Sequence, residues 1–367
     1  MDYYDADVLV VGAGFSGLSF ARRYAEQHPG KRVCIIEKRD HIGGNCFDFV
    51  DGRGFFVQKY GPHVFHTNND VVWNFLSEFT DWLPYKHKVI AQYGGDYYPV
   101  PINRNTINKF YGVNLGSEEE VRDFLDTVKV DVGKARNSRD VVVSRFGEDL
   151  YNAFIRHYTK KQWGLYPEEL PRSVLERLPI RYGGNDFYYD ANYQGIPSDG
   201  FTRLFERMVD LSNISVFLGV DFLAVKDDVS SDVLVVNSMR IDEFFNFEFG
   251  ALPYRFSRFE FEELECDGFQ PNSVVNYTEP EPDFIRSTEF KKLYFQDIPG
   301  SVVCREYTGS VGVPTYPVPA FGVGEAVSKY LDIVPANMRF IGRLGLHRYI
   351  DMDTACASAL DLAEELK

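Results

Sequence analysis

Hydrophobic residues near the start of the chain follow the pattern of a βαβ unit. Asp7–Val11 is a short apolar run typical of a buried parallel strand, and Leu18–Gln27 has apolar residues at helical spacing. A second apolar run, Arg32–Glu37, follows the expected helix. Strand, helix and strand in this order predict an α/β domain built on a parallel sheet.

Later segments predict further strands of this sheet, a helical region and an antiparallel region. Apolar runs at 215–218 and 233–236 are expected to return to the first sheet. Lys86–Val100 alternates like a hairpin that turns at 94–96, and residues 243–310 alternate like antiparallel strands. Short helices are expected at 118–128, 138–145, 147–161, 171–178, 198–210 and 353–366.

A glycine-rich turn joins the first strand to the first helix. Gly12 permits the tight turn, Gly14 lets the backbone approach a pyrophosphate, and Gly17 allows close packing of helix and sheet. The helix N-terminus then offers N–H groups and a positive dipole end to the phosphates. Glu37, at the end of the second strand, is placed to accept from a ribose hydroxyl. The other expected contacts of this unit are Phe15, Ser16 and Lys38.

A second pair of glycines narrows the choice of dinucleotide. Residues 37–44 resemble the E-x(5)-GG pattern of FAD-binding flavoproteins of the glutathione-reductase and amine-oxidase type. An NAD dehydrogenase would not need Gly43 and Gly44, which let a second loop approach the cofactor. We therefore expect FAD as the cofactor, with Gly44 and Asn45 among its contacts.

The first domain is predicted to be discontinuous, because its last strands lie far along the chain. The expected fold class is α/β, with a Rossmann-like FAD-binding domain, an inserted helical bundle and an antiparallel β-sheet domain. We assign the FAD-binding domain to 1–75, 200–240 and 325–367, the helical domain to 100–185, and the sheet domain to 76–99, 186–199 and 241–324.

Charge and composition restrict the partners. The net charge is −15 and the isoelectric point is about 5.0, so the surface repels nucleic acid and anionic membranes. No apolar run approaches the roughly 18 residues that a membrane span needs. The five cysteines lack zinc-site or redox spacing, and Asp2 and Asp5 stand where a signal peptide would be basic. We therefore expect a cytoplasmic protein with reduced thiols and no metal site.

Six motifs along the chain resemble those of the UDP-galactopyranose mutases. They occur in the family's order and, with the first strand and the last helix, span residues 7–360. The matching segments are Lys59–Thr67 (KYG-x-H-x-FHT), Tyr158–Gly164 (YT-x-KQWG), Tyr193–Pro197 (YQG-[IM]-P), Gly250–Arg255 (G-x-L-x-YR), Tyr316–Val318 (YPV) and Arg343–Met352 (R-L-x(4)-Y-x-DM).

The resemblance implies a flavin-dependent isomerase that interconverts the pyranose and furanose forms of a nucleotide diphosphate sugar. The implied reaction converts UDP-galactopyranose to UDP-galactofuranose for cell-surface polysaccharide synthesis, and the implied assembly is a homodimer. N5 of reduced FAD would attack the anomeric carbon, and NAD(P)H or another reductant would serve only to reduce the flavin. Such covalent catalysis by a cofactor needs no triad or paired carboxylates.

The resemblance also assigns the substrate site. Arg177 and Arg286 are expected to hold the diphosphate, because arginine offers phosphate oxygens a permanently charged fork, and His63 completes the implied catalytic set. Phe154 and Tyr158 lie four residues apart and are expected to sandwich the base. Further implied substrate contacts are Trp163, Tyr188, Tyr316, Tyr349 and Asp351. Further implied cofactor contacts are Gly61, His63, Arg343, Tyr349, Asp351 and Met352.

Several positions depart from the family pattern and leave other functions open. Ser238–Asp242 replaces TGPID, Glu248 replaces an arginine, and Val313 and Leu165 also differ. We hypothesise that Arg240 replaces the charge lost at Glu248. The alternatives are the same chemistry on UDP-N-acetylgalactosamine or a dTDP-fucose type of sugar, a net-redox FAD oxidoreductase of the amine-oxidase type, and an inactive nucleotide-sugar binder.

Overall fold

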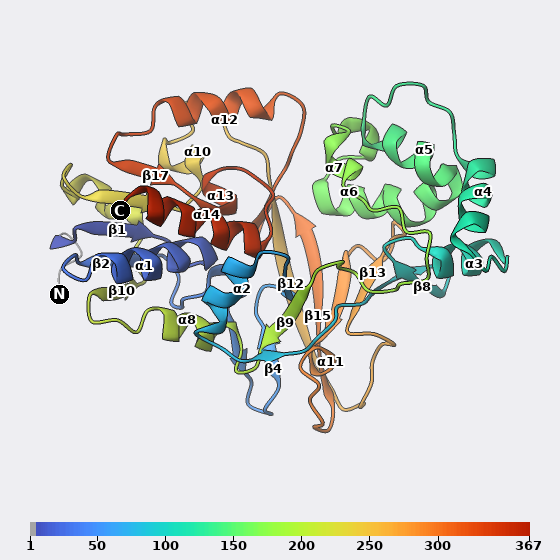
Figure 1. The fold of residues 1–367 in the computed structure, drawn as a ribbon, viewed down its shortest axis with the longest axis horizontal. Coiled ribbons are helices and arrows are strands. Elements are labelled where there is room, and N and C mark those ends of the chain that lie inside the picture. Colours follow the sequence, from blue (N-terminus) through green and yellow to red (C-terminus); the bar gives the residue numbers. More distant parts are fainter. Residues whose placement is uncertain (1–4) are drawn as a thin grey trace.

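A five-stranded parallel sheet forms the part of the molecule at the left of Figure 1. The computed structural model describes residues 5–367, so Asp2 lies outside the described residues. In spatial order the strands are β10 (Ile214–Leu218), β2 (Val33–Glu37), β1 (Val8–Val11), β11 (Leu234–Asn237) and β17 (Met338–Phe340). The two predicted return strands, β10 and β11, are therefore confirmed, and each strand lies within segments that we assigned to the FAD-binding domain.

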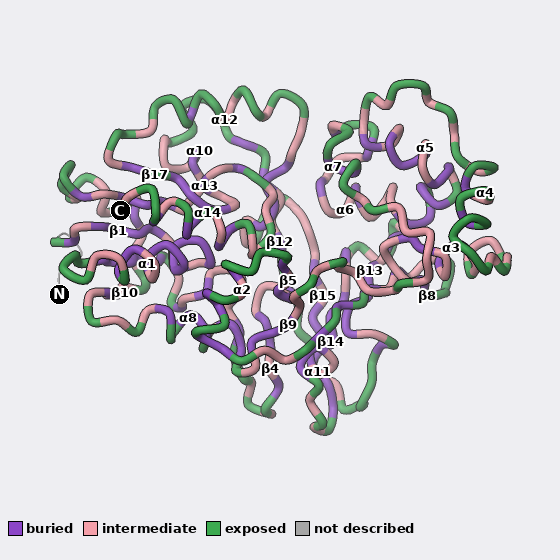
Figure 2. The backbone as a smooth tube through the Cα atoms, in the orientation of Figure 1, coloured by how far each residue is buried: buried purple, intermediate pink, exposed green. Residues whose placement is uncertain are grey.

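Alternate residues of β1 pack against different sets of helices. Val8 and Val10 join one buried core, whereas Leu9 and Val11 join another on the opposite face. Coverage of both faces explains the continuous apolar runs in the sequence, and Figure 2 shows these central strands as buried. The first core includes α1 (Phe15–Gln27), α2 (Asp70–Ser77), α8 (Phe201–Met208) and α14 (Met352–Glu365), and the second includes α9 (Phe222–Val225), α10 (Ile241–Phe244) and α12 (Val323–Asp332).

A seven-stranded sheet lies beside this unit, between it and the helices at the right of Figure 1. The expectation of antiparallel strands over 243–310 holds with one exception: β13 pairs with β7 in parallel. The end of α10 overlaps the start of this segment, and a short helix, α11 (Phe290–Leu293), lies within it. In spatial order the strands are β16 (Val313–Pro317), β12 (Tyr254–Leu264), β15 (Ser301–Gly309), β14 (Arg286–Glu289), β13 (Val274–Tyr277), β7 (Val89–Tyr93) and β8 (Asp96–Val100).

The helical region is a separate group of helices with its own core. The predicted break before residue 147 is confirmed by Gly147, whose φ of 81° lies in the left-handed region. The predicted helix over 147–161 is confirmed, except that residues 151–156 form a π-helical turn rather than an α-helical one. The α-helices are α3 (Arg104–Tyr111), α4 (Glu118–Val128), α5 (Ser138–Leu150), α6 (His157–Trp163) and α7 (Ser173–Glu176).

Small strands and one short helix complete the surroundings of the site. They are β3 (Asp48–Val50), β4 (Phe56–Gln58), β5 (Phe65–Thr67), β6 (Trp82–Leu83), β9 (Tyr193–Pro197) and α13 (Gly342–Gly345). β9 pairs with β5 and β6 in a separate small sheet, which fixes the end of the loop before β5. No helix within residues 5–367 combines the length and apolar character that crossing a membrane requires.

Candidate functional site

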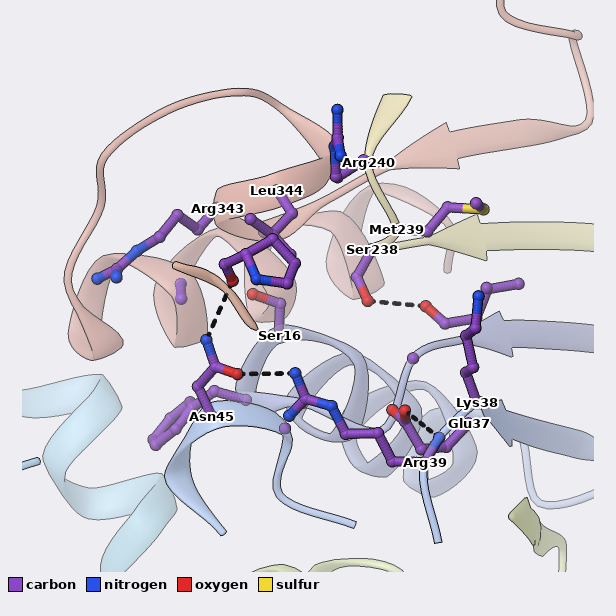
Figure 3. A pocket seen from close by; sticks show the side chains of 18 of the residues that line it. Ser16, Glu37, Lys38, Arg39, Asn45, Ser238, Met239, Arg240, Arg343 and Leu344 are labelled. Atoms are coloured by element: carbon purple, nitrogen blue, oxygen red, sulfur yellow. Dashed lines mark hydrogen bonds between the residues drawn. The ribbon is translucent and has the colours of Figure 1, made fainter. Parts of the chain in front are cut away.

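A cavity of about 530 Å³ opens at the glycine-rich turn after β1 (Figure 3). It lies between β1, β2, β11, α13 and the start of α14, where the carboxyl ends of parallel strands typically bind nucleotides. Twelve of the expected cofactor contacts line it: Gly12, Gly14, Phe15, Ser16, Glu37, Lys38, Gly44, Asn45, His63, Arg343, Asp351 and Met352. The other three, Gly17, Gly61 and Tyr349, do not line it.

The two glycine motifs pack directly against each other. A Cβ on Gly44 would lie 2.9 Å from Cα of Gly14, and the Gly43 N–H donates to Ala13 O at 2.7 Å. A Cβ on Gly17 would lie 2.1 Å from Gly12 O, which agrees with a packing role for Gly17. A Cβ on Gly14 itself would meet no atom closer than 3.8 Å, so the space before Gly14 is open to a ligand.

The rim of this cavity offers donors that have no partner among residues 5–367. Helix α1 has Gly14 as its N-cap, with no capping side chain, and no acidic residue in its first turn. Arg39 donates from Nη2 to Asn45 Oδ1 at 2.9 Å, but its buried Nη1 has no hydrogen-bond partner among the described residues. Both groups suit the phosphates of a dinucleotide.

Glu37 connects the glycine turn to β2. Its two carboxylate oxygens accept from the N–H groups of Ala13 at 2.8 Å and Arg39 at 2.9 Å. Each oxygen keeps a second lone pair for a ribose hydroxyl. The expected role of Glu37 toward a ribose therefore stays a prediction, next to a structural role that the sequence did not indicate.

Sequence reasoning missed several residues of the cavity lining. The structure adds Arg39, Ser238 and Arg240, and it closes one side with an ion pair of 2.8 Å between Lys38 and Asp221. Ser238 contacts the turn closely, because a Cβ on Gly12 would lie 2.2 Å from its hydroxyl oxygen. Ser238 and Arg240 follow β11, and a residue directly after a parallel strand is a usable signal for such a site.

A second cavity of about 730 Å³ lies next to the first. Of the expected substrate residues it contains Arg177 and Tyr188. Its other polar lining residues were not predicted and are His66, Thr67, Asn68, Asn69, Arg181, Tyr189, Asp190 and Asp353. Arg177 is exposed, and the described residues provide no ion-pair partner for it. The guanidinium is therefore available to an anion.

Two short segments, residues 63–67 and 349–353, separate the two cavities. His63 and Asp351 line the first cavity, whereas His66 and Asp353 line the second. Tyr349 lies between them, because its ring is 4.8 Å from the Arg343 guanidinium carbon and 4.4 Å from that of Arg177. The residues around Tyr349 therefore form a wall that the two cavities share.

Arg286 forms a buried ion pair beside this wall. Its Nε lies 3.1 Å from Oε2 of Glu306, and the two side chains are 18% and 4% exposed. Burial alone would lower the pKa of Arg286, but the Glu306 carboxylate raises that pKa above its ordinary value. Arg286 also donates from Nη2 to the hydroxyl of Tyr158 at 3.3 Å. Tyr316 donates to Glu306 at 3.3 Å, so the pair belongs to a larger network.

The remaining aromatic residues of the expected site divide into two groups. Trp163 lies in an edge-to-face cluster with Tyr316 and Tyr349, at centroid distances of 6.0 and 5.5 Å. Phe154 is 3% exposed and packs in the core of the helical region, with its ring 5.1 Å from that of Tyr98. The structure thus gives Phe154 a packing role, and its stacking on a base stays a prediction.

The comparisons with known proteins agree along the whole chain. The profile of the UDP-galactopyranose mutase family matches residues 153–349, and a profile of NAD(P)-binding Rossmann-like domains matches residues 10–79. A probable UDP-galactopyranose mutase of Klebsiella pneumoniae is 37% identical over 98% of this chain and 94% of its own length. The chain belongs to the UDP-galactopyranose mutase family. It is therefore an isomerase of the mutase class that acts on nucleotide sugars.

Further comparisons give a second relative of this chain and two solved structures with the same fold. A dTDP-fucopyranose mutase of Escherichia coli is also 37% identical, over 97% of both chains. A crystal structure of reduced UDP-galactopyranose mutase has the same fold, with a TM-score of 0.75, 16% identity and coverage of 98% and 93%. A putative protoporphyrinogen oxidase from Exiguobacterium shares the fold at a TM-score of 0.65 and 12% identity, over 98% of both chains.

The departure from the mutase pattern after β11 has a structural explanation. Arg240 forms a two-point contact with the fully buried carboxylate of Asp242, at 2.7 Å from Nη2 and 3.2 Å from Nε. Asp242 also accepts from the N–H of Leu252 at 2.9 Å, which fixes the following loop. Glu248 is exposed on that loop. Arg240 is thus already engaged by Asp242, and its replacement of the charge lost at Glu248 stays a hypothesis.

Proposed function

We propose that the chain is a flavin-dependent mutase that converts UDP-galactopyranose to UDP-galactofuranose. The observation that carries the proposal is the wall shared by the two cavities. It brings Arg343 of the first cavity and Arg177 of the second onto the ring of Tyr349. A sugar nucleotide bound at Arg177 would have to extend past this ring into the first cavity, because attack on the anomeric carbon requires direct contact with the flavin.

The first cavity fits FAD. Gly14 leaves room for a close approach, the uncapped N-terminus of α1 suits a pyrophosphate, and Nη1 of Arg39 needs an acceptor. Lys38 and Asp221 would enclose the nucleotide end, and His63, Asp351 and Met352 would face the other. When bound in its reduced form, the flavin supplies the nucleophile for the anomeric carbon.

The chain's own contribution to the reaction is binding and electrostatic stabilisation. Arg177 and Arg286 provide two guanidinium groups for the diphosphate, which must leave the anomeric carbon as an anion. Burial raises the pKa of the Tyr158 and Tyr188 hydroxyls above their ordinary value. Both hydroxyls therefore stay protonated at neutral pH and can donate to phosphate oxygens.

His63 is suited to act as an acceptor rather than as a cation. Its Nδ1 lies 3.0 Å from the Gly61 carbonyl, which assigns the proton of the neutral ring to Nδ1 and leaves Nε2 free to accept. Burial, with smaller contributions from the charges of Arg343 and Arg286, lowers the pKa of His63 to about 4. A neutral His63 would accept a hydrogen bond from a sugar hydroxyl or the flavin.

The test is product analysis with dithionite-reduced enzyme. UDP-galactopyranose, UDP-N-acetylgalactosamine and a dTDP-fucopyranose are each incubated with enzyme and separated by chromatography. We expect furanose product from UDP-galactopyranose, at a higher kcat/KM than from the other two. Preferred conversion of dTDP-fucopyranose would show that the chain shares the substrate of its dTDP-fucopyranose mutase relative. Consumption of one oxidant per turnover would indicate an oxidoreductase, and bound nucleotide without any furanose would indicate an inactive binder.

A further inference from the structure

The side chain of Lys161, on α6, is inserted into the loop that joins β13 to β14. Its ammonium nitrogen donates to the backbone carbonyls of Tyr277 at 3.1 Å, Pro282 at 2.6 Å and Phe284 at 3.2 Å. An ammonium group has three N–H donors, so this loop uses all of them. The described residues provide no ion-pair partner for Lys161 within 4.0 Å. The contact is therefore a clamp between a helix and the backbone of a hairpin.

The backbone of Lys161 extends the clamp to the rest of the sheet. Its carbonyl oxygen accepts from Nη2 of Arg255, on β12, at 3.1 Å. It also accepts from the hydroxyl of Thr308, on β15. One residue of the helical region thus contacts β12, β15 and the β13–β14 loop. The neighbouring Lys160 differs, because its Nζ donates at 2.8 Å to Gly164 O, at the end of its own helix.

The two elements that Lys161 joins carry residues from both sides of the proposed diphosphate site. Helix α6 carries Tyr158 and Trp163, and β14 begins at Arg286. Across the junction, Nη2 of Arg286 lies 3.3 Å from the hydroxyl of Tyr158. A shift of the hairpin relative to α6 would lengthen this contact directly.

We propose that Lys161 is a positioning residue of the mutase reaction. By holding α6 on the β13–β14 loop, it fixes the positions of Tyr158 and Trp163 relative to Arg286. Methionine at this position keeps the length and apolar stem of the side chain but provides none of the three donors. The loop lies partly at the surface, so its released carbonyls can reach water and the fold can persist. Removal of the three donors should therefore weaken substrate binding while the protein remains folded.

The experiment compares Lys161→Met with the matched control Lys160→Met, using reduced enzyme and UDP-galactopyranose. We expect Lys161→Met to raise KM at least tenfold with unchanged flavin content, and Lys160→Met to leave KM within twofold of wild type. Lys161→Arg should recover part of the loss, because it restores charged donors with a different geometry. Should Lys161→Met purify without flavin, Lys161→Gln replaces it with the same expectation.

A second measurement separates positioning from a general loss of structure. If Lys161 acts through the Tyr158–Arg286 contact, its substitution should have a clearly smaller effect in a Tyr158→Phe background. Equal effects in both backgrounds, or a wild-type KM in Lys161→Met, would overturn the inference. The inference rests on the proposed function for its substrate. If wild-type enzyme converts another sugar nucleotide instead, the proposed substrate is wrong and Lys161 is tested with the accepted one.

Discussion

The two proposed diphosphate arginines should respond differently to removal. Arg177 is exposed and contacts the ring of Tyr349, whereas Arg286 is paired with the buried carboxylate of Glu306. A charge-assisted hydrogen bond contributes about 1.5–3 kcal/mol, and about 1.4 kcal/mol corresponds to tenfold in rate. Loss of either guanidinium should therefore lower kcat/KM about 10- to 150-fold. Substitution by lysine should recover only part, because a point charge does not reproduce the fork.

Only Arg286→Ala should also destabilise the protein. Its removal leaves Glu306, which is 4% exposed, as a buried and uncompensated carboxylate. Breaking a buried pair in this way costs about 3–5 kcal/mol. At about 2–4 °C per kcal/mol for domains of 150–250 residues, the unfolding temperature should fall by about 6–20 °C. Arg177→Ala should leave the unfolding temperature unchanged.

A double substitution distinguishes the two effects at Arg286. Arg286→Ala combined with Glu306→Gln should recover most of the lost stability, because no charge is left buried, but it should not recover kcat/KM. The assays are steady-state kinetics on reduced enzyme and thermal unfolding, with flavin content measured for each variant. Arg172→Ala is the matched control, since Arg172 lies in the same segment as Arg177 and pairs with Glu176 at 3.5 Å on the surface. Near-wild-type kcat/KM in both alanine variants would refute the assignment of the diphosphate to this site.

Three further predictions concern the cofactor cavity. Gly14→Val should yield folded but colourless protein, because Gly14 lines the cavity without close contacts. The control Gly30→Val lies in open space and should stay yellow. Flavin absorbance per chain measures cofactor content in both variants. Oxidised enzyme should be inactive and regain activity on reduction without consuming reductant in each cycle; equal rates in both states, measured by product chromatography, would contradict the flavin mechanism. Because the pKa of His63 is about 4 in the fold and ordinarily 6.5, the unfolded chain binds the proton more readily. The contribution of neutral His63 to the free energy of unfolding is therefore complete above pH 6.5 and is lost as the pH falls to about 4. His63→Gln should make the unfolding temperature less sensitive to pH in this window.

The sequence predicted those parts of the fold whose signals are local. The apolar runs at 7–11, 32–37, 215–218 and 233–236 became strands of one parallel sheet, because a strand buried on both faces must be continuously hydrophobic. The parallel pairing of β13 with β7 was missed, since no local pattern indicates which distant strand becomes a neighbour. The π-helical turn at 151–156 was missed for a related reason, because its residues keep an ordinary helical pattern.

The sequence likewise predicted those parts of the candidate site that lie in contiguous motifs and missed contacts between distant segments. The contacts within contiguous motifs, such as Gly12, Gly14 and Glu37, do line one cavity. Glu306 was missed, although a buried acidic residue in the largely buried strand β15 was a signal that could have found it. The free Nη1 of Arg39 could not be predicted, because it depends on how the loop at Asn45 folds back over β2.

The charge of the two cavities explains how a protein of net charge −15 can be expected to bind two anionic ligands. The lining of the first cavity contains four cationic and four acidic side chains, and that of the second contains two of each. Several of the acids are already engaged, since Glu37 accepts from two backbone N–H groups and Asp221 pairs with Lys38. The guanidinium groups of Arg39 and Arg177 have no such acidic partner among the described residues. The field that a phosphate meets inside is therefore set by these nearby arginines rather than by the acidic surface, because salt screens distant charges over about 10 Å.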